Sequence, residues 1–143
     1  SNQFGAVLGT FPGVHALTDV TGFGLGGHLL EMLNASEGNR AELDWSSLPT
    51  LPAERLTALA AAFCMPQNTT RNFTANAADF PSLSGPELML LFDPQTSGGL
   101  LAAVSPESED AVAQAARDAN QLWVKIGTVL AASQEQKRVE ILR

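Results

Sequence analysis

The chain has 143 residues, a length typical of one domain, and hydrophobic residues make up 45% of it, which excludes wholesale disorder. Its 15 acidic residues outnumber its 8 basic ones, and the formal net charge of −7 disfavours binding to a nucleic-acid backbone. One cysteine excludes an internal disulfide framework, and no apolar run is long enough to span a membrane, so we expect a cytoplasmic protein without nucleic-acid or membrane partners.

The first third of the chain predicts a short segment, a strand, a helix and a second strand. Residues 4–8 are apolar and read as a helix end or a connector, whose abrupt start predicts that a larger protein precedes it. Residues 15–20 predict a short strand that passes into a glycine-rich stretch. From Leu25 the apolar residues recur at the spacing of an amphipathic helix, which Gly38 stops. Residues 41–45 alternate between apolar and polar, as in a half-buried strand.

The middle of the chain predicts a helix, a long loop and a buried strand. Thr50 and Pro52 open the helix, and Pro66 closes it. Residues 67–86 are polar and read as a long loop with room for a short helix, and loops of that length are usually functional. Residues 88–92 are continuously apolar, which favours a strand buried on both faces.

The last third predicts a strand, a helix and two further strands. Residues 100–104 form the first of these strands, and Ser105 is the expected cap of the helix that follows. Residues 123–129 predict a strand interrupted by a glycine, and residues 138–142 a final edge strand. Together these elements indicate one α/β (α+β) domain over residues 1–143, a single mixed-sheet sandwich with helices packed on the sheet.

Two stretches place polar and glycine residues directly against predicted buried elements. The first is TDVTGFGLGGH, residues 18–28, where glycines permit close approach of a ligand and a helix N-terminus offers N–H groups to an anion. Asp19 in this stretch is a hard oxygen ligand suited to Mg²⁺ that bridges phosphates. The glycines also fit a dinucleotide fingerprint, but Thr18, Asp19 and Thr21 interrupt the apolar strand that it requires. The structural alternative is a turn that serves only tight packing.

The second stretch is DPQTSGGL, residues 93–100. Its composition is typical of a turn, and spacing alone favours that structural role. The functional alternative is a wall of hydroxyl and amide groups that faces the first stretch. Outside both stretches, His28 on the first helix is predicted to be a hydrogen-bonded packing residue, and Cys64 an inert buried thiol.

The two stretches, occurring together and in this order, resemble those of the selenide, water dikinase (selenophosphate synthetase) family, in the aminoimidazole ribonucleotide synthetase-like superfamily. The resemblance covers nearly the whole chain, because LWVKIG at residues 122–127 is similar to the family's C-terminal strand. It concerns only the C-terminal domain of a two-domain, homodimeric enzyme that converts selenide, ATP and water into selenophosphate, AMP and phosphate with Mg²⁺. The family's essential Cys or selenocysteine and its glycine-rich nucleotide loop belong to an N-terminal domain that this chain lacks, so the isolated chain is expected to be inactive.

The same resemblance implies particular site residues. Asp19 corresponds to the Mg²⁺-ligating aspartate of the family's TDVTGFG motif, and no catalytic residue is assigned to this chain. The residues expected to form one wall of the ATP site are Thr21, Gly22, Phe23, Gly24, Thr96, Ser97 and Gly98. Two alternatives stay open: a superfamily relative that phosphorylates another small molecule, and a non-catalytic binding or dimerisation module.

Overall fold

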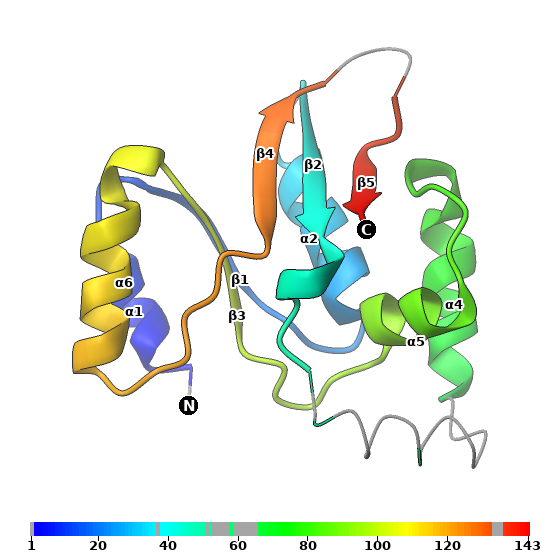
Figure 1. Ribbon diagram of the computed structural model, residues 1–143, viewed down its shortest axis with the longest axis horizontal. Coiled ribbons are helices and arrows are strands. Elements are labelled where there is room, and N and C mark those ends of the chain that lie inside the picture. The colour runs from blue at the N-terminus through cyan, green and yellow to red at the C-terminus, as the bar shows by residue number, and fades with distance from the viewer. Residues whose placement is uncertain (1, 37, 51, 53–57, 59–65, 133–135) are drawn as a thin grey trace.

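A three-stranded sheet stands at the centre of the molecule, with helices behind it and on both sides (Figure 1). The computed structural model describes residues 2–36, 38–50, 52, 58, 66–132 and 136–143. The helices and strands in chain order are α1 (Phe4–Leu8), β1 (Val14–Asp19), α2 (Gly24–Asn34), β2 (Asn39–Asp44), α4 (Gln67–Asn76), α5 (Gly85–Phe92), β3 (Leu100–Val104), α6 (Glu109–Asp118), β4 (Gly127–Ala131) and β5 (Val139–Leu142).

The described strands form two small sheets. In the central one, β2 lies between β4, with which it is antiparallel, and β5, with which it is parallel. Gly127 allows β4 to approach, since a Cβ there would lie 2.2 Å from the carbonyl oxygen of Glu42. The other sheet is the antiparallel pair of β1 and β3, in which Asp19 lies opposite Leu100. This pairing brings the end of β1 next to the start of β3.

Helix α2 packs against β1, β2 and α5 and contributes to the hydrophobic core. Leu29, Leu30 and Leu33 of this helix are buried in one cluster with residues of β2 and α5. Leu91 and Phe92 of α5 are fully buried in that cluster. The position of α2 beside β1, β2 and α5 therefore fixes where the preceding glycine-rich stretch lies.

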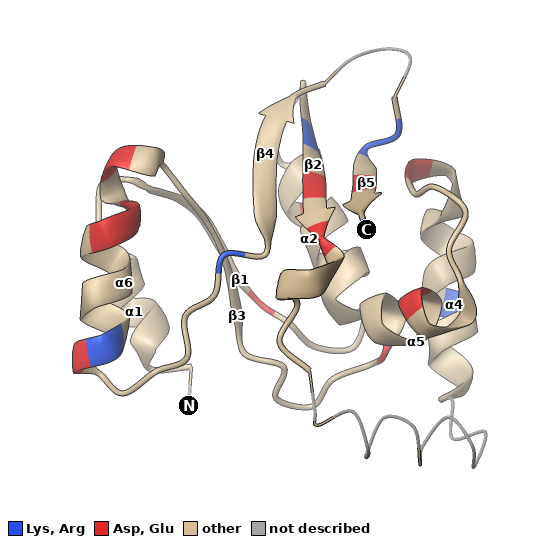
Figure 2. Cartoon of the chain, viewed as in Figure 1, with Lys and Arg blue, Asp and Glu red and all other residues tan. Residues whose placement is uncertain are grey.

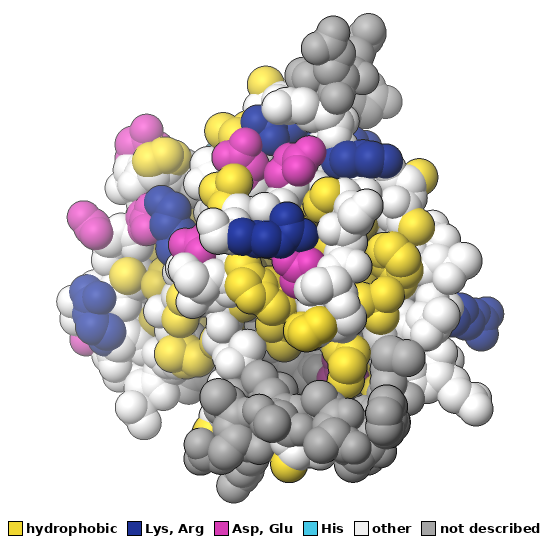
Figure 3. Space-filling model, turned by 45° about the vertical axis from the view of Figure 1, so that its right-hand side comes forward, with side chains coloured by type: hydrophobic (Ala, Val, Ile, Leu, Met, Phe, Trp, Pro, Cys, Tyr) yellow, Lys and Arg dark blue, Asp and Glu magenta, His cyan; other side chains and the backbone are white. Residues whose placement is uncertain are grey.

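Hydrophobic side chains also reach the surface. Figure 3 shows them in the middle of one face, with basic and acidic side chains above them. Within the ranges that the structure describes, no helix is both long and apolar enough to cross a membrane.

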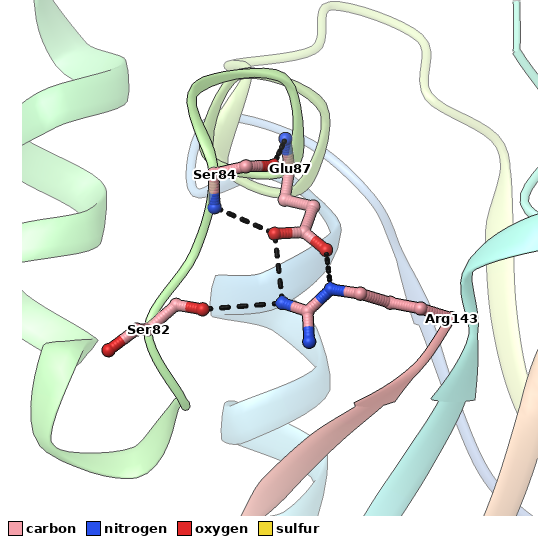
Figure 4. Close-up of polar contacts among 4 residues, drawn as sticks. All are labelled: Ser82, Ser84, Glu87 and Arg143. Atoms are coloured by element: carbon pink, nitrogen blue, oxygen red, sulfur yellow. Dashed lines mark hydrogen bonds and ion pairs between the residues drawn. The ribbon is translucent and has the colours of Figure 1, made fainter.

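The prediction of a strand over residues 88–92 is wrong, because these residues end helix α5. A capping box starts the helix: the Ser84 hydroxyl accepts a hydrogen bond from the backbone N–H of Glu87, and the Glu87 carboxylate accepts one from the backbone N–H of Ser84 (Figure 4). Arg143, just beyond β5, donates two further bonds to Glu87, of 2.6 and 3.0 Å. The buried carboxylate thus links α5 to the chain after β5.

Three other expectations differ from the structure. Half of the predicted loop at residues 67–86 forms helix α4, where only a short helix was expected, and a 3-10 turn follows it. The strand expected from residue 123 begins only at Gly127, where β4 can approach β2. The side chain of Ser105 makes no capping bond, and a 3-10 turn (Pro106–Ser108) precedes α6.

The α/β class, with helices packed on β-structure, is confirmed, although the strands divide between two sheets. The structure also confirms the helix that starts near Leu25 and the strands at 15–20, 41–45, 100–104 and 138–142, within one or two residues at each end. Residues 4–8, read as a helix end or a connector, form a helix. Cys64 and most of the helix predicted between Thr50 and Pro66 lie outside the described residues.

Candidate functional site

The structure brings the two glycine-containing stretches together. We call residues 19–24 the β1–α2 loop and residues 93–99 the α5–β3 loop. Backbone hydrogen bonds join them directly: Val20 N–H donates to the Gly99 oxygen (3.0 Å), and Gly98 N–H donates to the Val20 oxygen (3.2 Å). The backbone N–H of Gln95 donates to the carbonyl oxygen of Thr21 (2.9 Å). The two loops therefore lie side by side, held by backbone hydrogen bonds.

Asp19 lies at the edge of this surface. It is the last residue of β1, and its side chain is exposed. Among the residues that the structure describes, none makes a hydrogen bond or ion pair to its carboxylate, and no group of three or more potential metal-ligating His, Cys, Asp or Glu side chains is found. A cation at Asp19 would therefore complete its coordination with water, with phosphate oxygens or with groups from elsewhere, a pattern that Mg²⁺ commonly shows.

Neither loop carries a basic residue. Lys and Arg are absent from residues 19–24 and 93–99, and the two connections are free of blue in Figure 2. No basic side chain of these loops therefore offsets the charge of a phosphate group, and the Asp19 carboxylate would repel one. A cation between the carboxylate and the phosphate would remove that repulsion.

Two glycines of the loops are required by packing. Gly24 has φ +72°, and a Cβ there would lie 2.7 Å from the carbonyl oxygen of Leu91, so any side chain would push α2 away from α5. A Cβ on Gly98 would lie 2.7 Å from the carbonyl oxygen of Val20 and would separate the two loops. Gly22 differs, because no atom lies within 4 Å of the position of its Cβ. The packing role that we weighed for the first stretch thus applies to Gly24, whereas Gly22 faces open space.

The side chains of Thr96 and Ser97 are exposed in the α5–β3 loop, beyond the bonds that hold Gln95 and Gly98. Phe23 is also exposed, at 52%, with its ring centroid 5.4 Å from that of His28. His28 is buried, with one ring nitrogen bonded to Thr21 and the other to Glu31, which confirms its prediction as a hydrogen-bonded packing residue.

Sequence reasoning missed Asn72, which supports the β1–α2 loop from helix α4. Its side-chain N–H groups donate to the carbonyl oxygens of Gly22 (2.8 Å) and Phe92 (3.3 Å). Asn72 is buried, so these bonds satisfy groups that water would otherwise have to solvate. The sequence offered little indication of this role, because Asn72 lies in a polar run that looks like an ordinary surface loop.

Asp93 and Gln95 were also missed as individual residues. Burial raises the pKa of the Asp93 carboxyl, and a hydrogen bond from the Gln95 side chain opposes that rise. Asp93, at the start of the α5–β3 loop, is thus a partly buried acid. Its ionised form lowers the free energy of unfolding.

Known proteins match this chain over most of its length. A family model described as "AIR synthase related protein, C-terminal domain" matches residues 6–140. A selenide, water dikinase of Shewanella sp. (strain MR-4) is 47% identical over 108 residues, which are 76% of this chain and 30% of that protein. Selenide, water dikinases of Aeromonas hydrophila subsp. hydrophila and Aeromonas salmonicida (strain A449) are each 42% identical over 135 residues, or 94% of this chain and 38% of each relative. The chain therefore spans 30% to 38% of the length of these relatives.

Proposed function

The chain belongs to the family of AIR synthase related proteins, as their C-terminal domain, and from this premise we propose that it is the C-terminal domain of an ATP-dependent selenophosphate synthetase. The proposed reaction of the whole enzyme converts selenide, ATP and water into selenophosphate, AMP and phosphate. In it, this domain contributes one wall of the nucleotide site and a Mg²⁺ ligand, Asp19.

The observation that carries the proposal is the joining of the two loops beside a free carboxylate. The bond from Gln95 N–H to the Thr21 oxygen and the pair between Val20 and the Gly98–Gly99 backbone hold the loops together. Asp19 lies beside them, exposed. The curated relatives that support the choice of reaction carry the name selenide, water dikinase.

The charges of the site favour a metal-assisted reaction. Mg²⁺, when bound, would supply the positive charge that phosphoryl transfer needs. The chain's own part is to hold that ion through Asp19 and to offer loop backbone, open at Gly22, to the phosphates. Groups that bear positive charge would come from the rest of the enzyme, since the two loops have none.

The test uses the complete enzyme, with this domain in its natural context. Selenide-dependent formation of AMP and phosphate is measured while Mg²⁺ is titrated. We expect Asp19→Asn to raise the Mg²⁺ concentration needed for half-maximal activity by about tenfold or more, because one charged ligand is lost. Asp118→Asn, which removes an exposed acid at the end of α6, is the matched control and should leave the titration unchanged.

Two results would contradict the proposal. An Asp19→Asn enzyme with wild-type Mg²⁺ dependence would show that this domain does not bind the metal. ATP consumption that is indifferent to selenide would favour a superfamily relative with another acceptor. We also expect this chain alone not to turn over ATP, because we assign the other half of the site to the remaining part of the enzyme; robust turnover abolished by Asp19→Asn would overturn that expectation.

A further inference from the structure

Three side chains form a hydrogen-bonded line that runs from the β1–α2 loop along helix α2 to solvent. The Thr21 hydroxyl oxygen lies 3.1 Å from Nε2 of His28, and Nδ1 of His28 lies 2.7 Å from Oε2 of Glu31. His28 is only 7% exposed, whereas the Glu31 side chain is 55% exposed. His28 and Glu31 are three residues apart and therefore share one face of the helix.

For a neutral imidazole beside an ionised carboxylate, the chemistry of these groups gives the direction of both bonds. An ionised carboxylate can only accept, so Nδ1 of His28 carries a hydrogen and donates it to Glu31. In the neutral imidazole, Nε2 then has no hydrogen and must accept one from the Thr21 hydroxyl. Glu31 thereby determines which tautomer His28 adopts, and His28 determines where the single hydroxyl hydrogen of Thr21 points.

Packing holds the imidazole in this orientation. The Phe23 ring lies over it at 5.4 Å between centroids, tilted by 39°. Phe23 can sit there because residue 27 is glycine: a Cβ on Gly27 would lie 2.5 Å from the Cβ of Phe23. Phe23 and Gly27 therefore help to keep His28 in place, and the exposed Phe23 ring covers the imidazole on one side.

We propose that His28, held by Glu31, is a positioning residue that makes the Thr21 hydroxyl a hydrogen-bond acceptor toward the water shell of the nucleotide's Mg²⁺. The proposal rests on the proposed function, because it assumes a metal–nucleotide complex at this loop. With its hydrogen turned to His28, the Thr21 oxygen keeps only lone pairs for the ligand side. Bound Mg²⁺ usually keeps several waters, whose hydrogens such an oxygen accepts.

The first test needs no activity. In the chain labelled with ¹⁵N-histidine, long-range ¹H–¹⁵N spectra at a pH of about 8, above the usual histidine range, report the tautomer of each ring. We expect the Nδ1–H form at His28, and its replacement by a mixture in Glu31→Ala. His15, the other histidine of the chain, is exposed and is the internal control, expected to be the same in both proteins. A predominant Nε2–H form at His28 in the wild type would overturn the proposal.

The second test measures the KM for Mg²⁺–ATP in the complete enzyme. Thr21→Val and His28→Phe should each raise the KM by about tenfold. The KM of the double variant should be little higher, because both substitutions remove the same hydrogen bond between Thr21 and His28. His28→Gln keeps an acceptor for the Thr21 hydroxyl and should recover most of the loss. A His28→Phe enzyme that loses thermal stability but keeps its KM would show a merely structural role.

The two proposals fail in different ways. Wild-type KM in Thr21→Val, with impaired Mg²⁺ dependence in Asp19→Asn, would overturn the role of His28 and leave the proposed function standing. Wild-type behaviour in both variants would count against the proposed function itself.

Discussion

The backbone N–H of Gln95 donates a 2.9 Å hydrogen bond to the carbonyl oxygen of Thr21. The same oxygen accepts a 3.0 Å bond from Gly24 N–H, at the start of α2. One carbonyl group thus fixes the entry of α2 and the position of the α5–β3 loop together. A substitution that displaces one of the two loops should therefore also displace the other.

Asn72 supports this arrangement from α4, and its removal should loosen the β1–α2 loop. We expect Asn72→Ala to lower the free energy of unfolding by about 1–3 kcal/mol, because the carbonyl oxygens of Gly22 and Phe92 lose a donor and the one of Phe92 is buried. Chemical denaturation measures the loss. Asn68→Ala, at an exposed position of the same helix, is the control and should cost less than about 0.5 kcal/mol. Equal losses in the two variants would refute the supporting role.

Gly24 and Gly22 allow a direct comparison of a glycine packed against another helix with a glycine that faces open space. Gly24→Ala should destabilise the protein by about 2–3 kcal/mol, since it combines a positive φ with a Cβ pressed against the Leu91 carbonyl oxygen. Gly22→Ala has no such clash and should change the unfolding free energy by less than about 1 kcal/mol. Thermal and urea unfolding of both variants would check the difference, and similar losses would contradict it.

Much of this fold was predictable because its patterns are local. The strand at residues 15–20 and the amphipathic period after Leu25 were both visible in the sequence. Spacing alone favoured a structural turn at residues 93–99, and a wall that faces residues 19–24 was the functional alternative; the backbone bonds between the two loops agree with that alternative. The roles of Asp19, Thr96 and Ser97 in binding remain predictions.

The rest depends on contacts that no local pattern records. A short apolar run such as residues 88–92 fits a strand or a buried helix equally well, and only the Ser84–Glu87 capping box distinguished them. Helix α4 is strongly polar, and it is held partly by a side chain that bonds to distant carbonyl groups. The start of β4 at Gly127 follows from its close approach to Glu42, which is 85 positions earlier in the chain.

The buried carboxylate of Glu87 should make the protein sensitive to acid. The hydrogen bonds from Arg143 lower the pKa of Glu87 from 4.5 to about 2. Because the folded pKa lies below the unfolded one, the stabilisation is fully present above pH 4.5 and is lost as the pH falls toward 2. At neutral pH, we expect Glu87→Gln to cost about 2 kcal/mol, less than the pKa difference alone gives, because the half-exposed Arg143 is screened by solvent.

Denaturation curves at pH 7 and pH 3 would measure this effect, and the Glu87→Gln protein should show a smaller drop between the two than the wild type. Glu109→Gln is the control, since its ion pair with Lys125 is exposed and should contribute less than about 0.5 kcal/mol. An unchanged pH dependence in Glu87→Gln would mean that other carboxyl groups govern the acid sensitivity.

Asp93 should have the opposite effect on stability. Burial raises the pKa of its carboxyl, so the fold favours the uncharged form and holds the ionised form at a cost. That cost appears as the pH rises above the ordinary value of 3.8 and is absent well below it. Asp93→Asn should therefore stabilise the protein by about 0.5 kcal/mol at pH 7 and leave it unchanged at pH 3, because the amide can still accept the bond from Gln95.

Asp118→Asn, at an exposed position, is the control for Asp93→Asn and should show no such pH-dependent gain. If the Asp93 charge is retained for function, the stabilised Asp93→Asn variant should also lose Mg²⁺–ATP-dependent activity in the complete enzyme, a trade-off common at active sites. Urea denaturation at the two pH values measures the first effect, and the AMP assay measures the second. A variant that is destabilised at pH 7 would show that the carboxylate is favoured in the fold, contrary to the effect of burial on its pKa.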